Sequence, residues 1–84
     1  MGWTVYILQC RDGTLYTGVT NDLDRRFSAH ARGAGAKYTK GRGPLKLLYA
    51  EPQDSRGAAL KREAAIKSLR RAEKKKLLQA RTGR

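Results

Sequence analysis

The chain has one cysteine, one histidine and two prolines among its 84 residues, and it has no long apolar run. The single Cys10 cannot form an intramolecular disulfide, and one Cys with one His cannot build the usual tetrahedral zinc site. No segment approaches the roughly 20 apolar residues that a membrane span needs, and the N-terminus lacks a signal-peptide pattern. We therefore expect a cytoplasmic protein without membrane association.

Acidic residues are scarce as well. Seven Asp and Glu accompany 19 Lys and Arg, which gives a formal net charge of +12. Residues 55–84 hold most of the surplus. Such an excess favours a polyanionic partner, most simply DNA or RNA, because each neutralised phosphate releases a counterion. A solvated basic tail is the weaker alternative, and an anionic membrane surface is unsupported because the basic segments lack exposed large aromatics.

Strand-like runs, turn residues and capping residues predict six elements in the order β-β-α-β-α-α. The third strand is apolar enough to lie centrally in the sheet. The expected segments are strand Trp3–Cys10, a hairpin turn over Arg11–Thr14, strand Leu15–Thr20, a helix capped by Asn21 or Asp22 and ending near Arg32, a basic loop Gly33–Pro44, strand Leu45–Glu51, and a helical stretch from Ser55 to about Ala80 with a break near Leu69–Arg71.

This order implies a single domain over residues 1–84. We expect an α/β fold in which a small, three-stranded, antiparallel-rich sheet is flanked by helices.

Helical spacing places several polar residues on the first helix. Leu23 and Phe27 are four residues apart and mark its inward stripe. Arg26 and His30 are also four apart and flank that stripe, so they can lie at the sheet edge. Arg25 is turned further away.

The second helical stretch places a carboxylate among apolar residues. Glu63 falls on the side that we expect to be buried, and a carboxylate there needs a partner or a metal ion. An ordinary salt bridge to Arg62 or Lys67 is the alternative. The apolar residues that mark this side are Ala59, Leu60, Ile66 and Leu69.

These residues together resemble the GIY-YIG nuclease superfamily. Thr4-Val5-Tyr6 and Tyr16-Thr17-Gly18 are similar to its two motifs, with Thr4 and Val5 in place of the first Gly and Ile. The run to Arg26 and His30 is similar to the following helix, and Glu63 to the metal-binding glutamate. The loop Gly35–Thr39 resembles the branch of structure-selective endonucleases and small single-domain bacterial proteins.

The resemblance implies a DNA endonuclease that hydrolyses phosphodiester bonds in branched, flap or damaged DNA, in repair or recombination. Its catalytic residues would be Tyr6, Tyr16, Arg26, His30 and Glu63. Tyr6 would be the general base, with a pKa lowered by nearby cations and with His30 as its proton acceptor. Tyr16 would hold the phosphate and Arg26 would neutralise developing charge. Which tyrosine is the base stays open.

The scarcity of acids limits the metal site. Two-metal sites normally need several carboxylates, and Glu63 alone is expected inside. A single Mg²⁺ or Mn²⁺ ion, held by Glu63 and mostly by water and phosphate, fits better.

Basic residues elsewhere are candidates for nucleic-acid contact. In the loop they interleave with an aromatic residue, as on surfaces that meet single strands or distorted DNA. A solvated helical face is the alternative for the triplet Lys74–Lys76. The candidates are Lys37, Tyr38, Lys40, Arg42, Lys67, Lys74 and Lys75.

Two questions about function stay open at this point. A non-catalytic nucleic-acid-binding module with the same fold is the alternative to the nuclease, and RNA is an alternative to DNA. A partner protein that supplies targeting is also compatible with the sequence.

Overall fold

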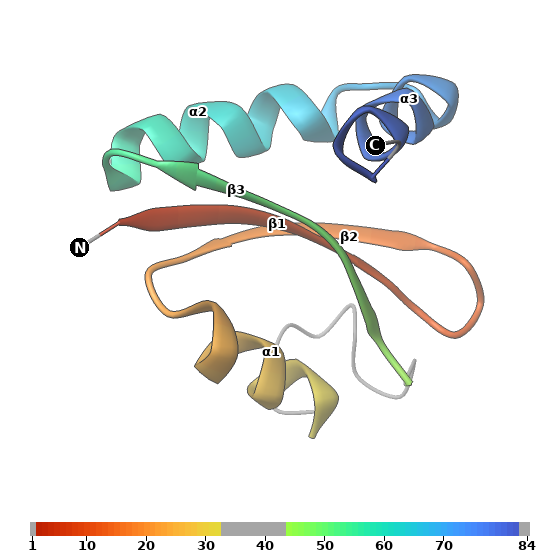
Figure 1. Ribbon diagram of the computed structural model, residues 1–84, viewed down its shortest axis with the longest axis horizontal. Helices are drawn as coiled ribbons and strands as arrows, with labels where there is room; N and C mark the ends of the chain where they lie inside the picture. Colours follow the sequence, from red (N-terminus) through yellow and green to blue (C-terminus); the bar gives the residue numbers. More distant parts are fainter. Residues whose placement is uncertain (1, 33–43, 83–84) are drawn as a thin grey trace.

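The computed structural model describes residues 2–32 and 44–82. Within this part of the chain the elements follow the expected β-β-α-β-α-α order, which confirms the predicted fold class. Figure 1 shows the sheet between α1 on one side and α2 with α3 on the other. The elements are β1 (Trp3–Gln9), β2 (Leu15–Thr20), α1 (Leu23–Ala31), β3 (Lys46–Gln53), α2 (Arg56–Lys67) and α3 (Arg71–Thr82).

The three strands are antiparallel in the order β2-β1-β3, so β1 is central. The expectation that the third strand lies centrally is therefore wrong. Residues Val5–Leu8 of β1 are all buried, whereas β3 carries the exposed Lys46, Leu47 and Pro52. Proline lacks an N–H for the ladder, which suits an edge strand. β3 also runs two residues beyond its predicted end.

A tight turn joins β1 to β2, as the Asp-Gly pair predicts. Gly13 N–H donates to the Cys10 carbonyl at 2.9 Å, and Gly13 has a φ of +86°, which glycine adopts without steric cost. The Asp12 carboxylate accepts from the backbone and hydroxyl of Thr14 at 3.1 and 2.6 Å. The turn sets the β1–β2 register in which Tyr6 lies opposite Gly18.

Side-chain caps define where the helices begin. Asp22 caps α1, because its carboxylate accepts from the Arg25 N–H at 3.2 Å. Ser55 caps α2 through the Ala58 N–H at 3.1 Å. The predicted break falls between α2 and α3, where the Glu73 carboxylate accepts from the Arg70 N–H at 2.9 Å and starts a new helix. This contact explains a break that has no Gly or Pro.

The main hydrophobic core lies between the sheet and the α2–α3 layer. Leu60 was expected to face it but is 38% exposed, because it follows Ala59 and one residue of helix turns it off the buried face. The buried members of this core are Val5, Ile7, Tyr49, Ala59 and Ile66, and Trp3, Leu15, Val19, Leu77 and Leu78 pack against them.

The opposite face of the sheet carries α1. Successive strand residues point to opposite faces, so Tyr6 and Leu8 face away from the core that holds Val5 and Ile7. The expected inward stripe of α1 is only half-buried, and the buried residue of this helix is His30. Its burial follows from its hydrogen bond to the sheet, described below. None of the helices in residues 2–32 and 44–82 is long and apolar enough to cross a membrane.

Candidate active site

A buried tyrosine–histidine pair links the central strand to α1. The hydroxyl of Tyr6 lies 2.9 Å from Nε2 of His30, and each residue is 1% exposed. Strand alternation turns Tyr6 toward α1, and His30 in the last turn of α1 meets it. A polar pair this deeply buried needs mutual hydrogen bonding to offset its lost hydration. The fold therefore holds both side chains in one fixed arrangement.

Gly18 makes room for this pair. It lies opposite Tyr6 in the β1–β2 register. A Cβ at this position would lie 2.5 Å from the Tyr6 hydroxyl oxygen, 2.7 Å from Tyr6 Cζ and 3.1 Å from Tyr16 Cε2. Both phenol rings therefore occupy the space above the Gly18 backbone.

Tyr16 and Arg26 complete the cluster on this face. The Tyr16 ring centroid is 6.4 Å from that of Tyr6 and 5.2 Å from that of His30. Hydrogen bonds to Tyr6 and, more weakly, to Tyr16 raise the pKa of Arg26. The structure thus brings four of the five predicted catalytic residues into direct contact, two from the strands and two from α1.

The pKa of Tyr6 is shifted upward, opposite to the expected direction. Burial raises this pKa above 10.0, and the neighbouring Tyr16 and Glu63 add to the rise. Arg26 lowers the Tyr6 pKa through a hydrogen bond and its charge, but burial outweighs it. The nearby cation therefore acts in the expected direction, but the net pKa of Tyr6 is raised, and Tyr6 is a neutral phenol at neutral pH.

His30 is shifted toward its unprotonated form. Burial, and then the charge of Arg26, lower the pKa of His30 below 6.5. Between a neutral phenol and a neutral imidazole, the phenol O–H is the hydrogen-bond donor and the unprotonated ring nitrogen is the acceptor. We assign the Tyr6 hydroxyl as donor and His30 Nε2 as acceptor, while the Tyr6 oxygen accepts from Arg26.

Glu63 lies on α2, which packs across β1 and β2 from the other layer. After burial and the charge of Tyr16, its charge makes a smaller contribution to the raised pKa of Tyr6. The Lys67 ammonium pairs with the Glu63 carboxylate at 3.2 Å, and the two side chains are 54% and 20% exposed. The salt bridge to Lys67, considered above as an alternative to a metal ion at Glu63, is thus present. Arg62 pairs instead with Glu51 at 2.7 Å.

The donors near Glu63 suit a hard cation with few protein ligands. Within residues 2–32 and 44–82, no three His, Cys, Asp or Glu side chains gather into a metal-binding group. Mg²⁺ keeps several waters and needs only one or two carboxylates beside substrate phosphates. A single carboxylate that is one-fifth exposed fits that mode, and Lys67 is exposed enough to move aside.

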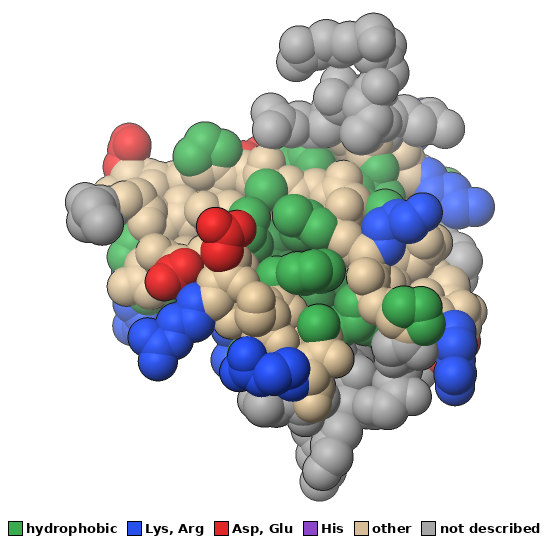
Figure 2. All heavy atoms as spheres, turned by 60° about the horizontal axis from the view of Figure 1, so that its bottom comes forward, with side chains coloured by type: hydrophobic (Ala, Val, Ile, Leu, Met, Phe, Trp, Pro, Cys, Tyr) green, Lys and Arg blue, Asp and Glu red, His purple; other side chains and the backbone are tan. Residues whose placement is uncertain are grey.

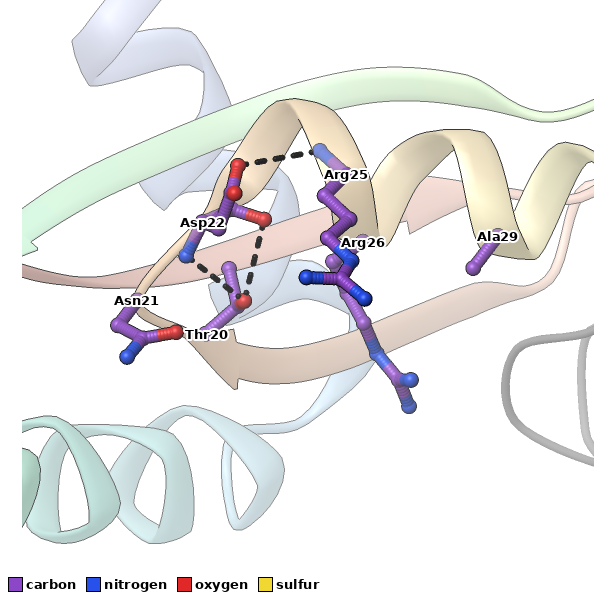
Figure 3. Close-up of a pocket in the computed structure, with 6 residues that line it drawn as sticks. All are labelled: Thr20, Asn21, Asp22, Arg25, Arg26 and Ala29. Carbon is purple, nitrogen blue, oxygen red and sulfur yellow. Dashed lines mark hydrogen bonds between the residues drawn. The ribbon is translucent and has the colours of Figure 1, made fainter.

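A hollow opens beside Arg26, where β2 ends and α1 begins. It has a volume of about 490 Å³, and Figure 3 shows its lining residues. Both arginines at the start of α1 line it, although Arg25 is exposed and Arg26 is half-buried, in line with the expectation that Arg25 is turned further from the sheet. Consecutive residues differ by about 100° around a helix, yet these long side chains extend to the same hollow. The lining residues are Thr20, Asn21, Asp22, Arg25, Arg26 and Ala29.

The surface on the α1 side is mixed in character. Figure 2 shows hydrophobic side chains gathered at its centre, Lys and Arg along its lower and right margins, and Asp and Glu at its left. Among the residues that the structure describes, positive charge therefore lies at the margins of this face.

The predicted nucleic-acid contacts are not all near the tyrosines. Lys74 and Lys75 lie on α3, which Figure 1 shows on the side of the sheet opposite α1. Lys67 lies on α2, where it forms an ion pair with Glu63. The remaining four candidates lie outside the described residues: Lys37, Tyr38, Lys40 and Arg42.

Comparison with known proteins decides the family. The model of the GIY-YIG catalytic domain matches residues 2–76. The chain belongs to the GIY-YIG family. It is 52% identical over 79 residues to a UPF0213 protein of Natronomonas pharaonis, covering 94% of this chain and 93% of that protein. It is 50% identical over 78 residues to a UPF0213 protein of Clostridium perfringens, covering 93% and 84%.

Solved structures agree with the fold of this GIY-YIG protein. The solution structure of UPF0213 protein BH0048 from Bacillus halodurans has a TM-score of 0.63 at 46% identity, covering 95% of this chain and 85% of that one. Protein EF2693 from E. faecalis has a TM-score of 0.68 at 35% identity, covering 100% and 90%. GIY-YIG is a nuclease superfamily, which suggests a nuclease and a nucleic-acid partner. The UPF0213 names themselves state no activity.

Two parts of the site were missed by sequence reasoning. Gly18 was considered only as part of the Tyr16-Thr17-Gly18 motif, although a glycine inside a strand often marks a close approach of other atoms. Arg25 and Asn21 were not considered for binding. The adjacency of Arg25 to Arg26 was the one available signal, and the helical wheel argued against it.

Proposed function

We propose that this GIY-YIG protein is a metal-dependent DNA endonuclease that hydrolyses phosphodiester bonds. The observation that carries the proposal is the buried hydrogen bond between Tyr6 and His30, 2.9 Å long. A phenol that donates to an unprotonated imidazole is a proton-transfer pair. Arg26, which hydrogen-bonds both tyrosines, adds a guanidinium suited to bind a phosphate next to that pair.

The proposed reaction uses Tyr6 and His30 as a relay. A water molecule attacks phosphorus, and its proton passes to the Tyr6 oxygen while the Tyr6 proton passes to His30 Nε2. The raised pKa of Tyr6 disfavours a free phenolate at neutral pH, so both protons move together. The lowered pKa of His30 keeps its nitrogen ready to accept. Tyr6 thereby acts as a base without first becoming an anion.

Arg26 and Tyr16 act on the phosphate. Arg26 stabilises the charge that develops on the phosphoryl oxygens, and Tyr16 donates a hydrogen bond to one of them. Glu63 is the residue that would hold a single Mg²⁺ or Mn²⁺ ion. Bound there, such an ion would contribute positive charge that favours phosphate binding and departure of the leaving oxygen.

The proposed substrate is branched, flap or damaged DNA in repair or recombination. The net charge of +12 supports binding to the nucleic-acid backbone, and the sequence carries no motif for reading base edges. A shape-selective cytoplasmic enzyme that is directed by a partner protein is consistent with these features.

A non-catalytic binding module is the second candidate. The ion pair between Lys67 and Glu63 favours it, because a carboxylate paired with an ammonium is less available to a metal ion. RNA would be an alternative ligand for such a module.

The test is cleavage of labelled junction, flap and duplex DNA with Mg²⁺, Mn²⁺ or EDTA. We expect metal-dependent nicking that falls at least about 100-fold in Glu63→Gln and Tyr6→Phe while DNA binding persists. Asp54→Asn, which removes an exposed carboxylate, is the matched control and should nick normally. Wild-type rates in Glu63→Gln would refute the assigned metal ligand. Binding without cleavage of every substrate would favour the second candidate.

A further inference from the structure

The hollow beside Arg26 has a feature that the proposed chemistry leaves unused. Arg26 is engaged with the tyrosines, whereas the Arg25 side chain is exposed and lines the same hollow. Within residues 2–32 and 44–82, no ion pair or hydrogen bond involves the Arg25 guanidinium. The hollow that Arg26 lines therefore holds a second cationic side chain, that of Arg25.

The acid in this hollow does not neutralise that cation. The Asp22 carboxylate accepts from the Arg25 backbone N–H at 3.2 Å, and Thr20 Oγ1 bonds the Asp22 backbone at 3.0 and 3.2 Å. Figure 3 shows the carboxylate turned to the helix backbone and both guanidinium groups extending the other way. The Asp22 carboxylate thus caps α1, and the charged side chains that extend into the open part of the hollow are the two arginines.

We propose that this hollow binds the backbone phosphate next to the scissile one, with Arg25 as its cationic ligand and the Asn21 amide as a second donor. The subsite rests on the proposed function, because that function places the scissile phosphate at Arg26. Phosphates follow one another along a strand at about 3.4 Å of helix axis. Two arginines that are adjacent in sequence and share one hollow can bind two consecutive phosphates.

The size and chemistry of the hollow agree with this ligand. Its volume of about 490 Å³ lies within the usual range for small-ligand clefts, about 300–1,000 Å³, and accommodates a phosphate with its sugar. A guanidinium binds phosphate through two parallel N–H donors. Holding the second phosphate would strengthen binding of the strand next to the scissile phosphate without acting on the reacting bond itself.

The test compares Arg25→Gln with wild type in binding to a labelled flap duplex in EDTA, which prevents metal-dependent cleavage. Each phosphate contact adds about 0.9 to the slope of log affinity against log salt. We expect the slope to fall by about 0.9 in Arg25→Gln. Between about 50 and 200 mM salt, wild type should then lose about 3.5-fold more affinity than the variant. Arg25→Lys should keep the wild-type slope.

Arg11→Gln is the matched control, because Arg11 is an exposed arginine in the β1–β2 turn. Its slope should equal that of wild type. An unchanged slope in Arg25→Gln, or an equal fall in Arg11→Gln, would overturn the subsite. Thermal melting should show both variants folded, since neither side chain is buried.

Nicking separates this inference from the proposed function. If wild type nicks DNA, Arg25→Gln should raise the KM and leave kcat within about twofold, because the contact is uniform binding. An unchanged KM with wild-type nicking intact would refute the subsite alone. If wild type nicks nothing, the proposed function fails, and the salt slopes still decide whether Arg25 contacts a phosphate.

Discussion

Replacing Gly18 with alanine tests whether the tyrosine pair needs the space above this residue. The added Cβ would lie 2.5 Å from the Tyr6 hydroxyl oxygen and 2.7 Å from Cζ. Carbon atoms in good contact lie at about 3.5–4.0 Å, so the ring must shift by about 1 Å. Tyr6 is 1% exposed and bonded to His30, so it has no open space to enter.

The expected costs follow from this shift. Overpacking a buried site costs about 1–3 kcal/mol, and replacing glycine gains about 0.4–1 kcal/mol from the unfolded chain. We expect the free energy of unfolding to fall by about 1–2 kcal/mol net, or roughly 4–16 °C in Tm for a domain of this size. A catalytic group displaced by 1 Å loses about 100-fold in rate.

The assay is nicking of flap DNA with Mg²⁺, together with thermal melting. Gly57→Ala is the matched control, because its Cβ would meet only Ser55 Oγ at 3.9 Å. That change lies within α2 and should stabilise by up to about 1 kcal/mol without altering the rate.

Wild-type nicking in Gly18→Ala would refute the close approach of Tyr6. A loss of rate in Gly57→Ala as large as that in Gly18→Ala would also refute it, because the effect would then not depend on the tyrosine.

Two further predictions concern charge. Lys67→Gln removes the ammonium 3.2 Å from the Glu63 carboxylate, so half-maximal nicking should need about twofold to fivefold less Mg²⁺. Lys67→Arg is the control and should leave the Mg²⁺ requirement unchanged. An increased Mg²⁺ requirement in Lys67→Gln would contradict the pairing. The pKa of His30 is lowered from 6.5, so the unfolded chain binds its proton first as pH falls. The free energy of unfolding should therefore decline below about pH 6.5, less so in His30→Gln, as urea titrations at several pH values would reveal.

Much of the fold could be predicted from local sequence signals. The Asp-Gly turn, the caps at Asp22 and Ser55 and the two helical patterns each act over a few residues. Strand order depends on contacts far apart in sequence. Leu45–Tyr49 contains four large apolar residues but forms an edge, since nothing local shows that β1 is covered by helices on both faces.

Four residues of the candidate site could be predicted from the sequence, but the direction of the pKa shift of Tyr6 could not. Spacing and the family resemblance indicated Tyr6, Tyr16, Arg26 and His30. The direction of the Tyr6 pKa depends on a competition between burial and Arg26. Sequence shows that an arginine is near, but only the packing shows how completely the phenol is removed from water.

Because burial outweighs Arg26 and raises the pKa of Tyr6, the two ways in which Tyr6 could serve as base predict different pH dependences of the rate. If a free phenolate were required, the raised pKa of Tyr6 would make the rate climb about tenfold per pH unit through neutrality. If the proton passes directly to His30, the rate needs only an unprotonated imidazole, whose pKa is below 6.5. The relay therefore predicts a rate that rises with pH in the acidic range and is level above about pH 7. Single-turnover nicking from about pH 5 to 9 at saturating DNA and Mg²⁺ separates the two, and a continued rise above pH 7 would exclude the relay.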